Sequence, residues 1–435
     1  MSASRPSFDV NDLVKQTATL LVYASILETL VGQAWMHLLY QLSSRVPTLE
    51  LLQSYSRCFA ALASSGQSWR SFLLSEILYA DNPFTQAAQT QQVPQGLQAA
   101  AAHDLAILQQ LYQVGDRLDQ RVEAATGNTL VSLQALGYEA IPDFPLARTL
   151  DETVSKPHHW PELIADLIDH HRQYGVGQFA RYRAFRWEEG QLTGIATPDP
   201  ITLQDLTGYD HPRRQLLQNT EALLKGHPAL NILLYGSRGS GKSSLVKALL
   251  NQYGQNGLRL IEVPKGELED LPKIVEQLRH RPQKFILFVD DLSFEEDDDA
   301  FKALKVVLEG SVTARPTNVV VYATSNRRHL IREFHDERPR PRDADEIHQW
   351  DTLQEKLSFS DRFGLTLTFE PADQAAYLHI VRHLAQQRRL EIAPEDLEHQ
   401  ALRWATRHNG RSGRSARQFI DALTAAKMRG DAEAL

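Results

Sequence analysis

The pattern of hydrophobic and polar positions divides the chain into three parts. From Val10 to about Tyr174, apolar residues recur at helical spacing almost throughout. From Thr202 to Phe369, short apolar runs alternate with helical patterns, which is typical of a parallel sheet covered by helices on both faces. From Pro371 to Lys427 the pattern is purely helical again.

These parts predict an all-α domain over residues 1–177, an α/β core over residues 178–370 and a helical lid over residues 371–435. Within the core we expect five strands, at Ile232–Tyr235, Leu258–Val263, Phe285–Val289, Val319–Ala323 and Leu365–Phe369. We expect helices after Gly241, from near Leu271, over Asp299–Leu308 and between Arg328 and Ser358.

The run Gln178–Trp187 mixes aromatic residues with arginines, and such aromatic enrichment favours a strand. At a period of two residues, one face would carry Phe179, Arg181, Arg183, Phe185 and Trp187. Such a face suits the stacking of nucleic-acid bases with contacts to phosphate. The alternative is that the aromatic rings pack onto the next domain while the arginines face solvent or an acidic neighbour.

One stretch, Thr19–Tyr40, is long enough to span a bilayer. Because Glu28, Gln33 and His37 lie within it, we expect a buried helix of the all-α domain and no membrane span. Charged residues interrupt any early apolar segment that would resemble a signal peptide. We therefore expect a cytoplasmic protein.

Composition excludes some classes of site. The formal net charge of −8 argues against a protein dominated by nucleic-acid binding. Cys58 is the only cysteine, which rules out a disulfide within the chain and a zinc site with several cysteines. Four histidines, His158, His159, His170 and His171, lie close together. Their adjacent pairs match no recognised metal-ligand spacing, so we expect solvated histidines at a helix end.

The segment Asn231–Leu250 carries the strongest chemical signal. A short apolar run enters a glycine-rich turn that contains Gly236-x-x-x-x-Gly241-Lys242-Ser243, and a helical pattern follows. The glycines let backbone N–H groups point at one anion, and the helix adds the positive end of its dipole. Lys242 can reach the β- and γ-phosphates, and the Ser243 hydroxyl can complete a magnesium shell.

The sequence therefore predicts a phosphate loop that binds a nucleoside triphosphate. Its predicted binding residues are Gly236, Ser237, Arg238, Gly239, Ser240, Gly241, Lys242, Ser243 and Ser244.

Two further apolar runs end in polar residues that suit the same chemistry. The run from Phe285 ends in Asp290 and Asp291; the first acid can lie beside the magnesium ion and the second can act as general base toward the attacking water. The run from Val319 leads to Asn326, whose side chain can bind both γ-phosphate and water if the two strands are neighbours.

Arginines near the chain's end suit a charged ligand as well. Arg362 precedes the last strand, from where it can reach a nucleotide bound by a neighbouring subunit, or alternatively pair with Asp361. In the lid, Gly410–Phe419 begins a helix that carries Arg414 and Arg417. Either arginine can fold back onto phosphate, and the spacing does not separate them.

In this order the motifs resemble those of AAA+ ATPases. More narrowly, the runs YGSRGSGKSSLVKALLN, FVDDLSFEEDD, YATSNRRHLI, EKLSFSDRFGL and RSGRSARQF resemble the bacterial family called domain of unknown function 815. The resemblance covers roughly Gln178 to the C-terminus. It implies an α/β AAA+ P-loop core with a parallel five-stranded sheet, and ATP with Mg2+ as ligands.

The resemblance also implies roles for single residues. It makes Lys242 and Ser243 the Walker A residues, Asp290 and Asp291 the Walker B pair, and Asn326 sensor 1. It makes Arg362 the arginine finger and places sensor 2 on Arg414 or Arg417. The segment Asp205–Tyr209 resembles one that packs near adenine, so Leu206 and Gly208 are expected at the base.

We expect an ATPase that assembles into a ring or filament, possibly a hexamer, and remodels a partner macromolecule. The N-terminal helices would dock an unidentified protein. One alternative is an ATP-gated binding switch with low turnover, since Asp291 stands where many such enzymes have Glu. Another, which we do not favour, is a nucleic-acid remodeller similar to helicase loaders. The segment Lys265–Asp270 lacks the aromatic residue that unfoldases present to a central pore.

Overall fold

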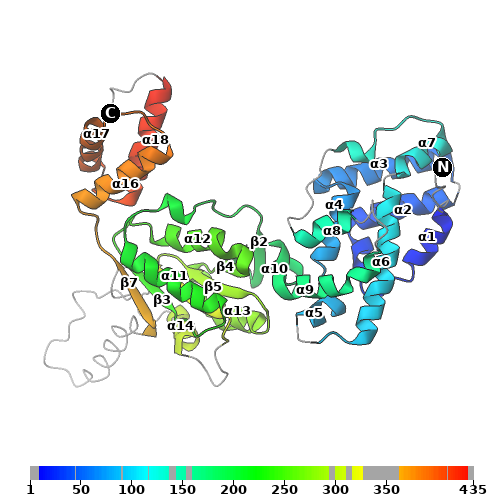
Figure 1. Cartoon of the computed structure of the whole chain (residues 1–435), viewed down its shortest axis with the longest axis horizontal. Helices are drawn as coiled ribbons and strands as arrows, with labels where there is room; N and C mark the ends of the chain where they lie inside the picture. The colour runs from blue at the N-terminus through cyan, green and yellow to red at the C-terminus, as the bar shows by residue number, and fades with distance from the viewer. Residues whose placement is uncertain are drawn as a thin grey trace. The chain divides into compact units, whose positions relative to one another are not determined.

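The computed structural model describes residues 9–44, 46–89, 92–115, 117–136, 144–152, 159–292, 299–309, 316–326, 362–408 and 410–429. The chain forms two compact units, Met1–Arg181 and Tyr182–Leu435 (Figure 1). The expected helix between Arg328 and Ser358 lies outside the described residues.

The first unit is helical in its described residues. Its α-helices are α1 (Val10–Thr17), α2 (Leu30–Ser43), α3 (Thr48–Ser65), α4 (Trp69–Leu78), α5 (Pro83–Ala88), α6 (Gln95–Gly115), α7 (Leu118–Thr126), α8 (Pro145–Glu152), α9 (Ile164–Tyr174) and α10 (Gly177–Arg181). Short 3-10 helices are η1 (Ala24–Glu28), η2 (Leu133–Leu136) and η3 (Trp160–Leu163).

Helix α6 is central to the core of this unit. Ala101, Leu105, Leu108 and Tyr112 recur at helical spacing and are fully buried. The indoles of Trp35 and Trp69 stack with ring centroids 3.8 Å apart, and Trp69 Nε1 donates to the Leu111 carbonyl at 3.0 Å. The expected buried helical domain is therefore organised around one apolar helix face.

The prediction of a single helix over Thr19–Tyr40 was wrong. A loop and η1 precede α2, which begins at Leu30 with the Thr29 side chain as its N-cap. The buried carboxylate of Asp104 accepts hydrogen bonds from the backbone N–H groups of residues 21 to 23, at 2.8–3.0 Å. These bonds satisfy backbone donors that a continuous helix would have paired internally. Among the described residues no helix is long and apolar enough to cross a membrane.

The second unit contains a seven-stranded sheet rather than the predicted five strands. Its strands are β1 (Ala184–Glu188), β2 (Gln191–Ile195), β3 (Ile232–Gly236), β4 (Leu258–Glu262), β5 (Lys284–Val289), β6 (Val319–Ser325) and β7 (Leu365–Phe369). Their order is β2-β1-β4-β5-β6-β3-β7, and β2 alone among them runs antiparallel to its neighbour.

The two additional strands form a tight hairpin. Glu189 and Gly190 both have positive φ angles, 51° and 76°, which suits a two-residue turn between antiparallel strands. Trp187 Nε1 donates to Asp270 at 2.9 Å, which holds β1 to the segment before α13. The parallel five-strand core is thus present as predicted, but extended at one edge.

The predicted aromatic and basic face of Gln178–Trp187 does not form. Residues Gly177–Arg181 are helical, and strand β1 begins only at Ala184. Arg181 pairs with Glu76 at 2.6 Å, whereas Phe185 and Trp187 are fully buried. Buried rings cannot stack on bases, so the packing interpretation describes these aromatic residues correctly.

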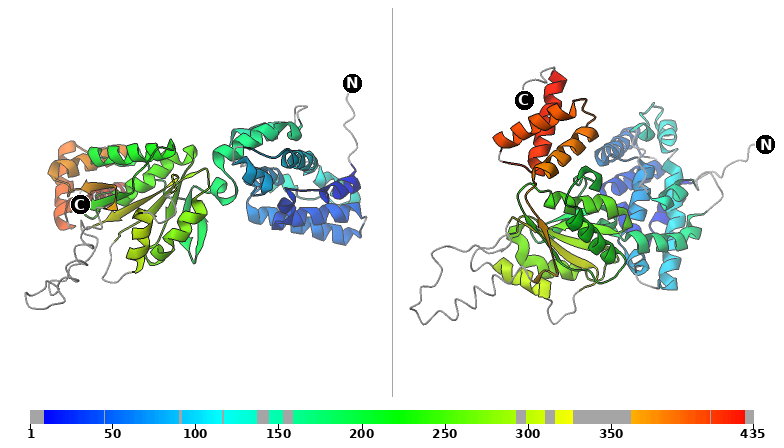
Figure 2. Two further views of the ribbon diagram at one scale, coloured as in Figure 1. Left: turned by 90° about the horizontal axis from the view of Figure 1, so that it is seen from below. Right: turned by 60° about the vertical axis from the view of Figure 1, so that its left-hand side comes forward.

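Helices cover both faces of the sheet. The α-helices of the core are α11 (Asp210–Leu224), α12 (Lys242–Tyr253), α13 (Leu271–Leu278) and α14 (Asp299–Glu309), with 3-10 helices η4 (Leu203–Asp205), η5 (Gly254–Asn256) and η6 (Lys265–Asp270). Figures 1 and 2 show α11 and α12 on one side of the sheet and α13 and α14 on the other. The lid consists of α16 (Gln374–Gln387), α17 (Pro394–Arg407) and α18 (Gly413–Arg429).

Strand order fixes the class of this fold. Strand β6 lies between β3, which leads into the phosphate loop, and β5, which ends at the paired acids. Because the strands are parallel, their carboxyl ends meet at one edge of the sheet. This α/β P-loop core with a helical lid is the AAA+ architecture that the resemblance implies.

His170 and His171 on α9 are buried, so their predicted solvent exposure was wrong. His170 Nε2 lies 3.2 Å from the Leu78 carbonyl and His171 Nδ1 lies 3.3 Å from that of Gly175. Burial lowers the pKa of His170 to about 4, and burial together with His170 lowers the pKa of His171 to about 3. Among the described residues, which do not include His158, no group of three or more His, Cys, Asp or Glu side chains could hold a metal ion.

These histidines should make the first unit sensitive to acid. In the unfolded chain each would have a pKa near 6.5, so below about pH 6.5 the unfolded state binds more protons than the folded one. The free energy of unfolding is therefore highest, as far as these histidines are concerned, above that pH. It falls toward pH 4 by up to about 1.4 kcal/mol per pH unit for each histidine. Urea unfolding from pH 7.5 to 4.5 measures this, and His171→Gln, which does not titrate, should reduce the slope. Equal slopes for the two proteins would contradict the assignment.

Candidate nucleotide-binding site

The phosphate loop follows β3 and is held by the end of β7. Ser237 N–H donates to the Phe369 carbonyl at 3.1 Å. At Gly236 φ is 145°, and a Cβ there would lie 1.9 Å from the same carbonyl oxygen, so only glycine fits. The loop therefore starts from a backbone position that two parallel strands determine.

Helix α12 begins at the end of the loop with its N-terminus uncapped by a side chain. Its N-cap, Gly241, is left-handed at φ 89° and offers no side-chain acceptor to the first turn. Backbone N–H groups of a first helical turn, together with the helix dipole, attract anions. The fold thus places an anion-binding helix end next to the glycine turn.

Lys242 lies within the loop and is only 6% exposed. Its Nζ donates to the carbonyl oxygens of Gly236 at 2.9 Å and Ser237 at 2.8 Å, with a longer contact of 3.4 Å to Asn326 Oδ1. Burial lowers the pKa of Lys242, while the charges of Asp290 and Asp291 act to raise it. The ammonium group is therefore a cation held between the loop and the paired acids.

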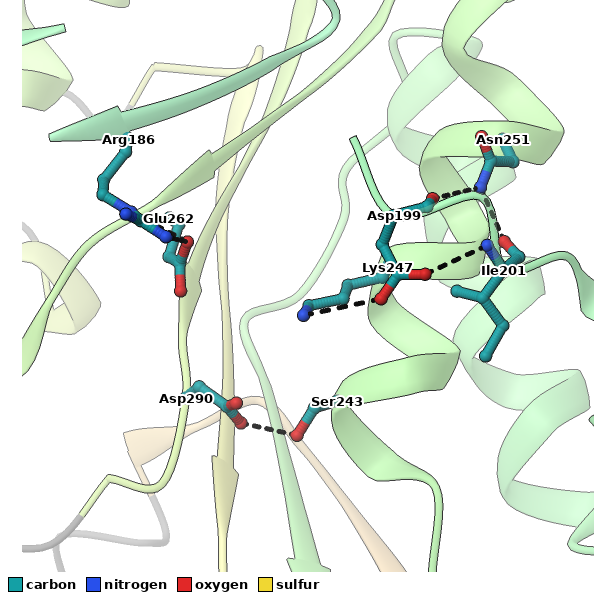
Figure 3. A network of polar contacts seen from close by, with 8 residues as sticks. All are labelled: Arg186, Asp199, Ile201, Ser243, Lys247, Asn251, Glu262 and Asp290. Carbon is teal, nitrogen blue, oxygen red and sulfur yellow. Dashed lines mark hydrogen bonds and ion pairs between the residues drawn. The ribbon is translucent and has the colours of Figure 1, made fainter. Parts of the chain in front are cut away.

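Asp290 accepts two hydroxyl hydrogen bonds at the carboxyl end of β5. Ser243 Oγ donates to its Oδ1 at 2.6 Å, and Thr324 Oγ1 donates to the same atom at 2.5 Å (Figure 3 shows the bond to Ser243). A carboxylate beside a serine hydroxyl offers the oxygen ligands that Mg2+ prefers, with room for water and phosphate oxygens. The residues present therefore fit the predicted metal.

Asp291 has a left-handed backbone, with φ at 52°. Aspartate and asparagine tolerate this conformation better than most residues. Asn326 Nδ2 donates to Asp291 Oδ1 at 2.6 Å, so Asn326 joins the second acid to Lys242. The pairing of β5 with β6 thus brings Asp291 and Asn326 together, and Lys242 at the start of α12 is the third side chain that the sequence predicted to act on the γ-phosphate.

Thr324 is a site residue that the sequence analysis missed. Its side chain is 2% exposed; the hydroxyl donates to Asp290 and accepts the Asp291 N–H at 2.9 Å. Alternation along a strand places Thr324 on the same side as Asn326, two residues later. The two-residue spacing between Thr324 and Asn326 is therefore the feature of the sequence from which Thr324 could have been predicted.

These groups line a cavity of about 530 Å³ that the lid helps to enclose. This volume lies within the range of about 300–1,000 Å³ that is usual for ligand pockets. The predicted residues that line it are Leu206, Arg238, Gly239, Ser240, Gly241, Lys242, Ser243, Ser244, Asp290, Asp291, Asn326, Arg414 and Arg417. Lining residues outside the predicted set are Asp205, Thr207, Thr324, Ile380, Leu384 and Gly413.

The lid holds the segment that was expected near the base. His379 Nε2 lies 2.9 Å from Thr207 Oγ1. His383 Nε2 lies 2.7 Å from the Gln204 carbonyl oxygen, and Gln387 Nε2 donates to the same oxygen at 2.9 Å. The apolar side chains of this end of the cavity are Leu206, Ile380 and Leu384. Gly208, which belongs to the same segment and has φ at 83°, does not line the cavity, so it is not at the expected position.

The two lid arginines occupy different ends of the cavity. Arg414 N–H donates to the Gly239 carbonyl at 3.1 Å, which ties the start of α18 to the phosphate loop. Arg417 lies near Asp205, whose pKa is lowered chiefly by hydrogen bonds from Thr202 and additionally by the Arg417 charge. The backbone at the start of α18 thus lies against the phosphate loop, and Arg417 lies toward Asp205.

Arg362 is separated from its own phosphate loop. It precedes β7, whose Leu365 pairs with Ile232 at the amino end of β3, while Phe369 pairs with Gly236 at the loop. Four strand residues span roughly 13 Å, so Leu365 lies about that far along the strand from Phe369 at the loop, and Arg362 precedes Leu365 in the chain. It does not line the cavity.

Comparisons with known proteins identify a family and distant relatives of this chain. The model of the family described as "Protein of unknown function (DUF815)" matches residues 180–427. The replication factor C large subunit of Staphylothermus marinus is 32% identical over 121 residues, which cover 25% of this chain and 28% of that protein. The chain therefore spans little more than a quarter of that relative.

Among solved structures, the Thermotoga maritima RuvB Holliday junction branch migration motor is 17% identical, with a TM-score of 0.36. The match covers 52% of this chain and 67% of RuvB. A structure of a point mutant of the same protein gives a TM-score of 0.37 at the same identity. These values are too low to bear on what the present chain binds.

Removing the Thr324 hydroxyl should destabilise the second unit. Thr324→Val keeps the side chain's shape but leaves the Asp291 N–H without its acceptor, at a cost of about 1–3 kcal/mol. Thr324→Ser keeps the hydroxyl and loses one methyl group, at a cost of about 0.8 kcal/mol. Urea unfolding of both variants tests this. A valine variant at least as stable as the serine variant would show that the hydroxyl bonds contribute nothing.

Proposed function

The chain belongs to the family described as protein of unknown function (DUF815), and from this premise we propose that it binds and hydrolyses ATP with Mg2+. One observation carries the proposal. Lys242, Asn326 and Asp291 form a connected polar chain beside the Ser243–Asp290 pair, within one cavity. These are the groups that phosphoryl transfer to water needs.

Each residue has a role that follows from its place. The loop N–H groups and Lys242 bind the β- and γ-phosphates, and Ser243 with Asp290 would hold Mg2+. Mg2+, when bound, neutralises charge on the phosphate oxygens. Asp291, oriented by Asn326, accepts a proton from the water whose oxygen bonds to the γ-phosphorus, while the bond from that phosphorus to the bridging oxygen breaks. The products are ADP and inorganic phosphate.

Arg362 is proposed to act on the nucleotide of a neighbouring subunit. Arg362 precedes the amino end of β7, whereas the loop lies at the carboxyl end of that strand, and Arg362 does not line the cavity. A second copy could set its own nucleotide beside Arg362. Head-to-tail interfaces repeat around a ring or along a filament, so each subunit would then supply an arginine to its neighbour. We propose such a homo-oligomer, with a hexameric ring as one form of it.

We propose that the cycle of this oligomer remodels or regulates a partner macromolecule. The domain 1–177 would recruit an unidentified protein, and the location would be the cytoplasm. DNA and RNA are not favoured as partners, since the aromatic residues that suggested stacking are buried.

A binding switch with little turnover is the second candidate. Asp291 is shorter than glutamate by one methylene, and its Oδ1 is already bonded to Asn326 at 2.6 Å. A carboxylate held in this way is a weaker general base until the contact opens. Single-turnover hydrolysis separates the two functions, because a rate near that of free ATP supports the switch.

Replacing Asp291 should separate binding from hydrolysis. Asp291→Asn keeps a residue that tolerates the left-handed backbone, so it should bind a fluorescent ATP analogue like wild type and hydrolyse ATP roughly two to four orders of magnitude more slowly. Lys242→Ala is the matched control that should lose nucleotide affinity as well. Turnover at the wild-type rate in Asp291→Asn would remove Asp291 from the proposed role.

Mixing two inactive variants should restore activity if Arg362 acts across an interface. Arg362→Ala subunits supply an intact Asp291, and Asp291→Asn subunits supply an intact Arg362. In an equimolar mixture, roughly a quarter of the interfaces then carry both groups by random assortment. Steady-state phosphate release should rise well above that of either variant alone. No gain on mixing, or full activity of Arg362→Ala, would refute action in trans.

A further inference from the structure

The start of lid helix α18 lies directly on the phosphate loop. The backbone N–H of Arg414 donates to the Gly239 carbonyl at 3.1 Å. A Cβ added at Gly413 would lie 3.1 Å from the same oxygen. A Cβ added at Gly239 would lie 3.0 Å from the Ser412 hydroxyl oxygen and 3.0 Å from Arg414 Cβ. Glycine on each side therefore lets lid and loop meet through their backbones.

The first turn of α18 is well anchored in the lid. Ser412 caps the helix: its hydroxyl accepts from the Ser415 N–H at 3.1 Å, and its carbonyl accepts from the Ala416 N–H at 2.9 Å. Ser415 and Ala416 are both buried. The Arg414 N–H is one of the donors that a helix leaves unpaired at its start, and the phosphate loop supplies its acceptor.

This bond fixes the orientation of one peptide group of the loop. In a planar trans peptide the C=O and N–H bonds point in opposite directions, so the Ser240 N–H points away from α18 while the Gly239 carbonyl points toward it. Both residues line the nucleotide cavity. Phosphate loops bind anions through backbone N–H groups. Turned the other way, the same peptide would present a carbonyl oxygen to the phosphates.

The glycine before this peptide leaves it free to rotate. Rotation of a peptide changes ψ of the preceding residue, and Gly239, with φ at 75°, accepts most backbone conformations. The core holds the peptides that follow the other two glycines of the loop. After Gly236, the Ser237 N–H donates to β7, and the Gly241 carbonyl accepts from the Leu245 N–H at 2.8 Å. The peptide after Gly239 is held from the lid instead.

We propose that α18 positions the phosphate loop, because the Arg414 N–H holds the peptide between Gly239 and Ser240 with the Ser240 N–H available to phosphate. The proposal rests on the proposed function. Arg414 acts here through its backbone and is a positioning residue, a role separate from the one expected of its side chain. By linkage, phosphate that binds better when α18 contacts the loop also stabilises that contact by the same factor.

Replacing the N–H tests the proposal. Arg414→Pro removes the donor and sets the ring Cδ against the Gly239 carbonyl, and proline is tolerated in the first turn of a helix. Arg414→Ala is the matched control, which loses the same side chain but keeps the N–H. Affinity for a fluorescent ADP with Mg2+ should be at least about tenfold weaker in the proline variant than in the alanine variant, as expected for one hydrogen bond to a charged group. Equal affinities would overturn the proposal.

Inorganic tripolyphosphate separates the phosphate loop from the base segment. It has no nucleoside, so its inhibition constant against fluorescent ADP should rise in Arg414→Pro by the same factor as the ADP dissociation constant. His383→Ala is a control for a loosened lid, since His383 contacts the Gln204 carbonyl in the base segment. It should leave tripolyphosphate binding nearly unchanged. A loss as large as in Arg414→Pro would show that general loosening of the lid, and not the peptide, sets phosphate affinity.

A second variant covers the case in which Arg414→Pro does not fold. Gly413→Ala favours the helix, but its Cβ would crowd the Gly239 carbonyl oxygen, so the contact must lengthen by a few tenths of an ångström. Tripolyphosphate should bind this variant severalfold more weakly, with helicity by circular dichroism unchanged. A folded Gly413→Ala that binds tripolyphosphate like wild type would contradict the positioning role.

Failure of the proposed function would give a different result. If wild type bound neither ADP nor tripolyphosphate, the proposed function would be wrong and the positioning role with it. If wild type bound both, and the two Arg414 variants bound them equally, the positioning role alone would be wrong. Binding that depends on the Arg414 N–H without turnover of ATP would contradict hydrolysis and leave the positioning role in place.

Discussion

The nucleotide site depends on how two consecutive acids are held apart at the end of one strand. Adjacent carboxylates repel each other, and side chains of successive strand residues point to opposite faces. The left-handed backbone of Asp291 turns the chain at this point, and the Thr324 hydroxyl bonds to the carboxylate of one acid and to the backbone of the other. Asp290 is thereby directed to Ser243, and Asp291 to Asn326.

This arrangement requires β6 to pair with β5. The same pairing also explains the position of Lys242. Asn326 extends from the end of β6 and contacts Asp291 on one side and Lys242 on the other. Strand β3 pairs with β6 on its opposite edge and delivers the phosphate loop. Three parallel strands therefore bring the cation, the amide and the acids together without help from the lid, which adds the contacts at the base segment and at Gly239.

Features that depend on local pattern could be predicted from the sequence. The five core strands, the phosphate loop and the order of the acids follow from short apolar runs and from glycines whose backbone positions accept no other residue. Thr324 was missed because its role arises only when β5 and β6 are paired. A strand was predicted over Gln178–Trp187, but its start was set too early, because Arg181 belongs to a helix held by Glu76 and β1 begins only at Ala184; β2 was not predicted. The burial of His170 and His171 could not be predicted, since their partners, the carbonyls of Leu78 and Gly175, depend on packing.

Strand β7 has a consequence for how successive sites in an oligomer would be connected. At its carboxyl end, the Phe369 carbonyl contacts Ser237 and leaves no space for a side chain at Gly236. Beyond its amino end lies Arg362, the group proposed to serve the adjacent subunit. A hydrogen-bonded strand transmits displacement along its axis with little compression. In the proposed oligomer, β7 would therefore link the phosphate loop of one subunit to the arginine that serves the next.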